Sequence, residues 1–249
     1  MLRLKPDHLR LPDFLGLGTQ KGGTSTLHAL LKAHPRIFLP PTKELHYFSL
    51  YFDRSSQWYA SHFEASTTTQ RCGEITPYYL FHPESPQRIR KLLPNAQLII
   101  LLRDPVERCL SQVFHAKRLG FEPLSPEDAI NAEPERLAFG TEYSLQKHSY
   151  QARSRYLEQL DRYEQLFPKQ QLLILRSEDL FEQPEQLWHQ LLEFLHLPSH
   201  PLAFPLPHAN KGHGEANKIS KALRAKLREE LAPTAAAIRD RYGFGWHWA

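Results

Sequence analysis

Residues 13–35 read DFLGLGTQKGGTSTLHALLKAHP, and this stretch decides the fold of the chain. The apolar run at 13–18 predicts a short buried strand that ends in a glycine turn. Residues 24–34 predict a helix that stops before Pro35, because the residue preceding a proline is disfavoured in helical geometry. A strand, a glycine-rich loop and a helix in this order are typical of a parallel α/β sheet.

Segments further along the chain repeat this alternation. The continuous apolar run QLIILL at 97–102 predicts a parallel strand covered on both faces. QLLIL at 171–175 predicts a third strand, and residues 36–82 are expected to be irregular and rich in aromatic side chains. The expected helices cover residues 83–93, 105–119, 126–132, 149–167, 184–195 and 219–231, and 198–214 is expected to be loop. The sequence therefore predicts an α/β fold with a central parallel sheet flanked by helices on both faces.

Length and composition set further bounds. The 249 residues suit one domain over 1–249, with 1–12 as an N-terminal extension and 208–241 as a loop and basic helix. The longest aliphatic run covers five residues at 98–102, so we expect no transmembrane segment, and the N-terminus lacks the apolar stretch of a signal peptide. The two cysteines, Cys72 and Cys109, lack the spacing of a disulfide framework or metal site. We therefore expect a cytoplasmic protein whose thiols are buried.

The charge of the chain is concentrated near one end. The formal net charge is +4, and residues 208–241 hold eight basic and four acidic residues. This local excess predicts an anionic small molecule or polyanion as partner, and it is too weak to indicate nucleic acid. A basic stripe on the last helix is either a solvated face or the approach of an acidic acceptor, and it contains Lys218, Lys221, Arg224 and Arg228.

The glycine loop at 16–26 suits a phosphate group. Backbone N–H groups converge in such a loop, and the following helix adds partial positive charge at its N-terminus. The loop departs from the nucleotide-triphosphatase pattern, because Lys21 lies inside it and Thr24 occupies the usual lysine position. Arg103, rather than an acid, follows the strand at 97–102. We expect a phosphate-bearing donor with no metal requirement; the alternative is a structural turn with a solvated Lys21.

Three further motifs carry candidate chemistry. In KELHYF at 43–48, Glu44 and His46 face the same way if the chain is extended, so they would take a proton from an alcohol. Arg103 and Ser111 are spaced to reach one phosphate, unless Arg103 pairs with a neighbouring acid. KGHG at 211–214 is a basic loop. The plain alternatives are that Glu44 is merely exposed, that His46 packs in the core and that the loop 211–214 is solvated.

In this order and spacing, the motifs resemble sulfotransferases that use 3′-phosphoadenosine 5′-phosphosulfate (PAPS), most closely the heparan-sulfate and carbohydrate branch. The resemblance runs from Phe14 to Trp246 and includes KGGT, KELHYF, GEITPYY, LIILLRDPVERCLSQ, KGHG and the closing GFGWHW. It implies that Glu44 is the general base with His46 as helper, and that Lys21 stabilises charge on the departing phosphate. The implied 5′-phosphate cradle is Gly22, Gly23, Thr24, Ser25 and Thr26. The implied 3′-phosphate residues are Arg103 and Ser111, and the implied lid is Lys211, Gly212, His213 and Gly214.

The resemblance also implies that transfer is direct and in line, without a metal, and releases adenosine 3′,5′-bisphosphate. Ile75 and His213 depart from the heparan branch, which has lysine and arginine there, so a heparan-like acceptor does not follow. The missing cysteine pair and membrane anchor fit a soluble bacterial enzyme. The acceptor is expected to be a carbohydrate or small molecule held by the aromatic segment 47–81, and the oligomeric state stays open. A P-loop small-molecule kinase and a non-catalytic nucleotide- or polyanion-binding protein are the other hypotheses.

Overall fold

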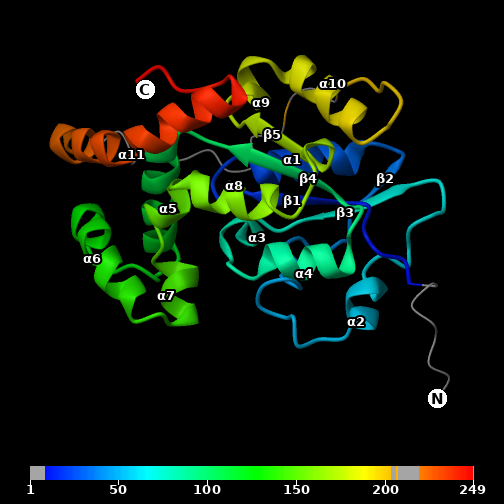
Figure 1. The fold of residues 1–249 in the computed structure, drawn as a ribbon, viewed down its shortest axis with the longest axis horizontal. Helices are drawn as coiled ribbons and strands as arrows, with labels where there is room; N and C mark the ends of the chain where they lie inside the picture. The colour runs from blue at the N-terminus through cyan, green and yellow to red at the C-terminus, as the bar shows by residue number, and fades with distance from the viewer. Residues whose placement is uncertain (1–8, 203–205, 207–218, 249) are drawn as a thin grey trace.

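The computed structural model describes residues 9–202, 206 and 219–248, and its centre is a five-stranded sheet (Figure 1). The strand order is β2-β3-β1-β4-β5, and every pair of neighbours is parallel. This confirms the predicted fold class. The strands are β1 (Phe14–Gly18), β2 (Ile37–Phe38), β3 (Arg71–Ile75), β4 (Gln97–Leu102) and β5 (Leu172–Arg176).

Both faces of the sheet are buried, which explains the continuous apolar strands. Along β4, Leu98 and Ile100 pack into one core cluster, whereas Ile99 and Leu101 pack into the other. Phe14 of β1 lies opposite Gly73 of β3 in the register. A Cβ atom at Gly73 would lie 2.2 Å from the ring of Phe14, so only glycine fits beside that ring.

Helices form a layer on each side of the sheet (Figure 1). α1 (Thr24–Ala33) and α10 (Pro184–Phe194) supply the core on one face. α4 (Ser85–Leu92), α8 (Tyr156–Glu164) and the last part of α11 (Lys221–Tyr242) supply the core on the other. A third cluster joins α5 (Pro105–Arg118) and α6 (Pro126–Ala138) to the first half of α11.

Short elements complete the chain. These are α2 (Ser56–Ser61), α3 (Tyr78–Phe81), α7 (Glu142–Lys147), α9 (Asp179–Glu182) and the 3-10 turns η2 (Ala152–Ser154) and η3 (Lys169–Gln171). Cys72 and Cys109 are both free and buried, as expected. Over the described ranges, no helix combines the length and apolar character needed to cross a membrane.

The structure corrects several sequence expectations. The segment 36–82 is not wholly irregular, because it contains β2, α2, β3 and α3. The segment 149–167 is not one helix, since α8 begins only at Tyr156, after a turn that surrounds the buried Arg153. α6 and α11 run well past the expected ends at 132 and 231, through Pro134 and Pro233. Residues such as Ile238 bury against the core, and this packing offsets the cost of a proline inside a helix.

Candidate active site

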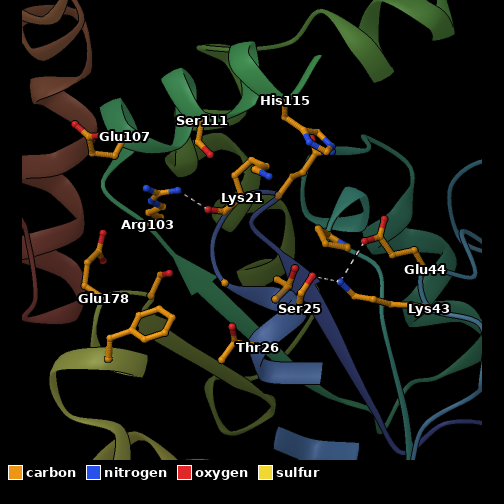
Figure 2. Close-up of a pocket in the computed structure, with 16 residues that line it drawn as sticks. Lys21, Ser25, Thr26, Lys43, Glu44, Arg103, Glu107, Ser111, His115 and Glu178 are labelled. Carbon is orange, nitrogen blue, oxygen red and sulfur yellow. Dashed lines mark hydrogen bonds and ion pairs between the residues drawn. The ribbon is translucent and has the colours of Figure 1, made fainter. Parts of the chain in front are cut away.

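A cavity of about 550 Å³ opens at the carboxyl ends of the strands, as expected for an α/β sheet (Figure 2). The segments that follow β1, β4 and β5 all contribute to its wall. Eight residues predicted from the sequence line it: Lys21, Gly23, Thr24, Ser25, Thr26, Glu44, Arg103 and Ser111. The chain thus brings the loop, the acid and the arginine motif to one place.

The glycine loop is held by a hydrogen bond within itself and by another from the segment that follows β5. The Gly22 amide donates to the Thr19 carbonyl (2.9 Å), and the Ser177 hydroxyl donates to the Gly22 carbonyl (2.9 Å). Gly23 is the N-cap of α1 in a left-handed conformation with φ 81°, and it has no side chain to cap the helix. Thr24 and the next two residues of α1 line the cavity. This arrangement presents a helix N-terminus to an anion.

Lys21 lies in a positive environment. Its carbonyl accepts a hydrogen bond from Nη1 of Arg103 (3.0 Å). Burial, together with the nearby charges of Arg118, Arg103 and Lys43, lowers the pKa of Lys21 from 10.5 to about 8. Among the described residues Arg103 forms no ion pair with an acid, although its positive charge opposes the rise that burial causes in the pKa of Glu178. An anion in the cavity would relieve this mutual repulsion.

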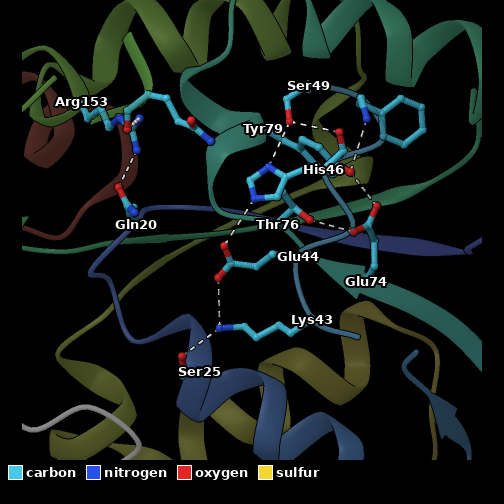
Figure 3. A network of polar contacts seen from close by, with 12 residues as sticks. Gln20, Ser25, Lys43, Glu44, His46, Ser49, Glu74, Thr76, Tyr79 and Arg153 are labelled. Carbon is cyan, nitrogen blue, oxygen red and sulfur yellow. Dashed lines mark hydrogen bonds and ion pairs between the residues drawn. The ribbon is translucent and has the colours of Figure 1, made fainter. Parts of the chain in front are cut away.

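Glu44 and His46 lie side by side, although not in the extended chain that the sequence suggested. Both have left-handed backbones, with φ of 61° and 54°. Nε2 of His46 is 3.7 Å from Oε2 of Glu44, and Nδ1 of His46 is 3.2 Å from the Ser49 hydroxyl. Lys43 approaches from the other side: its Nζ is 3.4 Å from Oε1 of Glu44 and donates to the Ser25 hydroxyl at 2.8 Å (Figure 3).

These contacts determine the charge of Glu44. Burial acts to raise the pKa of the Glu44 carboxyl, but its hydrogen bonds and charge interactions with His46 and Lys43 outweigh burial. The pKa of Glu44 is therefore lowered, and the group is ionised at neutral pH. An ionised carboxylate beside an imidazole is suited to accept a proton from a substrate.

A second cavity of about 180 Å³ continues from the first on the far side of Glu44. It contains His46, and it shares Gln20, Glu44, Pro77 and His115 with the larger cavity. Arg153 also lines it; this guanidinium is buried, donates to Gln20 and lies 4.7 Å from the centre of the Tyr78 ring. Glu44 therefore stands at the junction of two compartments.

The sequence reasoning missed several residues of the site. His115 lines both cavities one helical turn after Ser111, and burial, with Lys21 and Arg118, lowers its pKa to about 4. Ser177 and Glu178 follow β5, and the sequence reasoning singled out no residue there. Lys43 could have been predicted as a site residue, because it directly precedes Glu44 in the sequence. The folded chain was needed to identify their side chains as cavity walls.

The other predicted residues are not among the described residues that line the two cavities. Lys211, Gly212, His213, Gly214 and Lys218 fall outside the described residues. Ile75 is 1 % exposed and packs beside Gly16, and it lines neither cavity. In the basic stripe, Arg224 pairs with Glu107 of the cavity wall and Arg228 lies over Trp248, so part of the stripe makes internal contacts.

Asp104, which follows Arg103, has a structural role. Its Oδ1 caps α5 by accepting hydrogen bonds from the Val106 amide (2.9 Å) and the Glu107 amide (3.1 Å). Its Oδ2 accepts a hydrogen bond from the Trp248 indole. Both oxygens of Asp104 are thus engaged within the fold. In the part of the chain that the structure describes, no three His, Cys, Asp or Glu side chains are grouped to hold a metal ion.

Comparisons with known proteins agree on one family. The family model described as "Sulfotransferase domain" matches residues 11–226. The chain is 31 % identical to the "Membrane-associated sulfotransferase kil1" of Dictyostelium discoideum, over 75 % of this chain and 56 % of that protein. It is 27 % identical to "Heparan sulfate glucosamine 3-O-sulfotransferase 5" of Mus musculus, over 76 % of this chain and 54 % of that protein. The chain thus spans little more than half the length of these relatives.

Solved structures show the same fold. A sulfotransferase from Alicyclobacillus acidocaldarius superposes with a TM-score of 0.82 and 26 % identity, covering 96 % of this chain and 98 % of that one. Mouse sulfotransferase SULT7A1, solved in complex with PAP, superposes with a TM-score of 0.57 at 11 % identity, over 93 % of this chain and 85 % of that one. The second likeness concerns the fold alone.

Proposed function

The chain belongs to the sulfotransferase family, and from this premise we propose that it moves a sulfuryl group from PAPS to a hydroxyl or amine of an acceptor. The observation that carries the proposal is the shared cavity. The glycine loop, Arg103 and the carboxylate of Glu44 lie around one space at the carboxyl ends of the strands. A donor with phosphate groups and a base for the acceptor would meet there.

The donor side of the cavity fits a nucleotide that carries several negative charges. Lys21, Lys43 and Arg103 line it, and the N-terminus of α1 adds the partial charge of the helix dipole. Lys21 would hold the bridge between sulfate and phosphate and stabilise charge on the departing phosphate. Arg103 and Ser111, which line the wall formed by the end of β4 and by α5, would bind the 3′-phosphate.

On the acceptor side, Glu44 would act as the general base. Its carboxylate lines both cavities, so an acceptor that reaches from the smaller cavity into the larger one would meet Glu44 and the donor at their junction. His46 supports the charged carboxylate at 3.7 Å. The acceptor oxygen or nitrogen would lose its proton to Glu44 as it attacks the sulfur in line, and the adenosine bisphosphate would leave from the opposite side.

The acceptor that we propose is a carbohydrate or another small molecule. From the aromatic segment 47–81, the ring of Tyr78 lines the smaller cavity, and Phe121 lines it as well. Aromatic rings suit the apolar face of a sugar. Relatives named as heparan sulfate sulfotransferases support a carbohydrate acceptor. Ile75, which replaces a lysine of the heparan branch, is buried and lines neither cavity.

Binding and transfer measurements test the proposal. Isothermal titration should show that adenosine 3′,5′-bisphosphate binds without metal and more tightly than ATP with Mg²⁺. Tighter binding of ATP–Mg²⁺ would instead favour a kinase. A screen with ³⁵S-labelled PAPS across sugars, phenols, lipids and peptides should then identify the acceptor, and binding without any transfer would favour the non-catalytic hypothesis.

A matched pair of variants tests the base. Glu44→Gln should retain the affinity for adenosine 3′,5′-bisphosphate and lose transfer, because the amide accepts no proton at neutral pH. Glu107→Gln is the control, since this carboxylate lines the same cavity but pairs with Arg224. Near-wild-type turnover by Glu44→Gln would show that another group is the base.

A cytoplasmic location is also part of the proposal, and no nucleic acid partner is included. The relative named as membrane-associated makes location a point to test. Fractionation of cells that produce the protein should leave it in the supernatant after high-speed centrifugation. Recovery in the membrane pellet would overturn this part.

A further inference from the structure

The backbone around the candidate base adopts an unfavourable conformation. Glu44 and His46 both have positive φ, and Leu45 lies buried between them. Non-glycine residues in this region cost about 1–3 kcal/mol each, and they persist only where the surroundings impose them. Some neighbouring group must therefore hold this segment in place.

Ser85 and Arg88 donate hydrogen bonds to the Phe48 carbonyl at one end of the segment, and a further anchor is a second carboxylate, that of Glu74 on β3. Glu74 is 2 % exposed, and in the described part of the chain no cationic side chain pairs with it. Its Oε1 accepts hydrogen bonds from the hydroxyls of Tyr59 (2.7 Å) and Tyr79 (2.9 Å), and its Oε2 accepts one from Thr76 (2.8 Å). Burial raises the pKa of Glu74, and these hydroxyls together with the Leu45 backbone oppose that rise.

Two of these contacts extend to the segment that carries the candidate base. The Leu45 backbone, between Glu44 and His46, lies near enough to the Glu74 carboxylate to act on its pKa. The Tyr79 hydroxyl donates to Glu74 and accepts the Phe48 amide at 3.4 Å (Figure 3). The other end of this path is fixed to the sheet, because Glu74 lies in β3, which pairs with the central strand β1.

We propose that Glu74 is a positioning residue, which holds the Glu44–His46 segment in its reactive geometry through the Leu45 backbone and the Tyr79 hydroxyl. The inference rests on the proposed role of Glu44. It assigns to Glu74 no contact with donor or acceptor, since Glu74 lines neither cavity.

The two tyrosines provide a matched pair for the test. Tyr59 and Tyr79 are both fully buried, and both donate to the same oxygen of Glu74. Only the Tyr79 hydroxyl also bonds the 44–48 segment. Phenylalanine at either position keeps the ring and removes one donor, so both variants should lose some thermal stability. Tyr79→Phe alone should disturb the base.

The first measurement needs neither PAPS nor an acceptor. The pKa of Glu44 is followed by NMR in protein labelled with ¹³C-glutamate, and the signal is assigned by its loss in Glu44→Gln. If Tyr79→Phe loosens the contacts of Glu44 with His46 and Lys43, these contacts no longer outweigh the effect of burial on the Glu44 carboxyl. The pKa of Glu44 should then rise by about half a unit or more. Tyr59→Phe should leave it unchanged. Among the described residues, the charged or titratable side chains that interact with Glu44 include Lys21, His28, Lys43, His46, His115 and Arg153.

The second measurement is kinetic and uses the best acceptor from the transfer screen. Tyr79→Phe and Glu74→Gln should each lower kcat by about 10- to 100-fold, because a displacement near 1 Å has effects of this size. Both should keep the wild-type affinity for adenosine 3′,5′-bisphosphate, and Tyr59→Phe should keep kcat within about twofold.

The outcomes separate the inference from the proposed function. An unchanged pKa of Glu44 in Tyr79→Phe, or an equal shift in Tyr59→Phe, overturns the positioning role whatever reaction the protein performs. A wild-type protein that transfers no sulfate overturns the proposed function, and the NMR comparison still decides whether Glu74 orders the segment.

Discussion

Binding of adenosine 3′,5′-bisphosphate should be coupled to proton uptake by Lys21. Burial and three neighbouring cations lower the pKa of this side chain to about 8 in the free protein. A bound phosphate would favour the charged ammonium and raise the pKa again. Affinity should therefore be full below about pH 8 and should decline as the pH rises through that value.

The size of the effect follows from the pKa. At a pKa of about 8, roughly one Lys21 in ten is protonated at pH 9. The affinity should then fall about tenfold between pH 7 and pH 9, which is about 1.4 kcal/mol. The ligand contributes little to this change, because the second pKa of its phosphates is about 6 and their ionisation is nearly complete at pH 7.

Isothermal titration at pH 7, 8 and 9, in buffers of different ionisation enthalpy, measures the affinity and the proton count together. Lys21→Arg is the control, since a guanidinium stays charged over this range and should bind with an affinity independent of pH. Constant affinity of the wild-type protein from pH 7 to 9 would refute the reasoning. The same decline in Lys21→Arg would assign the proton to another group.

Three further predictions follow from contacts in and near the cavity. Arg103→Ala should weaken binding of adenosine 3′,5′-bisphosphate by about 10- to 100-fold in the same titration, since a hydrogen bond to a charged group contributes about 1.5–3 kcal/mol. Lys21→Ala should lower kcat on the order of 10²-fold in the sulfate-transfer assay, and a much smaller loss would make Lys21 peripheral. Gly73→Ala should destabilise the fold by about 1–3 kcal/mol in urea denaturation, because its Cβ would lie 2.2 Å from the Phe14 ring; unchanged stability would show that the strands separate at no cost.

The strands that the sequence predicted are those whose side chains are apolar on both faces. β4 appears at its predicted bounds, 97–102, because every one of its positions is buried. β3 escaped prediction because its sequence, RCGEI, contains two charges and a glycine. Tyrosine hydroxyls from other elements make the burial of Glu74 possible. The sequence of β3 alone does not predict these hydrogen bonds.

The site also has features that the sequence predicts and features that only the folded chain shows. The phosphate loop, Arg103 and Ser111 were predicted from spacing along the chain, because each group lies directly after a strand or on the helix that follows it. The lowered pKa of Lys21 depends on cations that lie far from it in the sequence, such as Arg118. Such encounters between distant segments arise only in the folded chain.

The left-handed residues have a consequence for protein engineering. Lys21, Glu44 and His46 keep side chains suited to chemistry at positions where the backbone favours glycine. A glycine scan at these three positions should therefore yield variants that unfold at higher temperature but turn over less substrate. It would also leave an empty space beside the acceptor in Glu44→Gly, where added formate or acetate could restore part of the lost rate. Rescue by such a small acid would measure how much of catalysis belongs to the carboxylate and how much to the backbone that presents it.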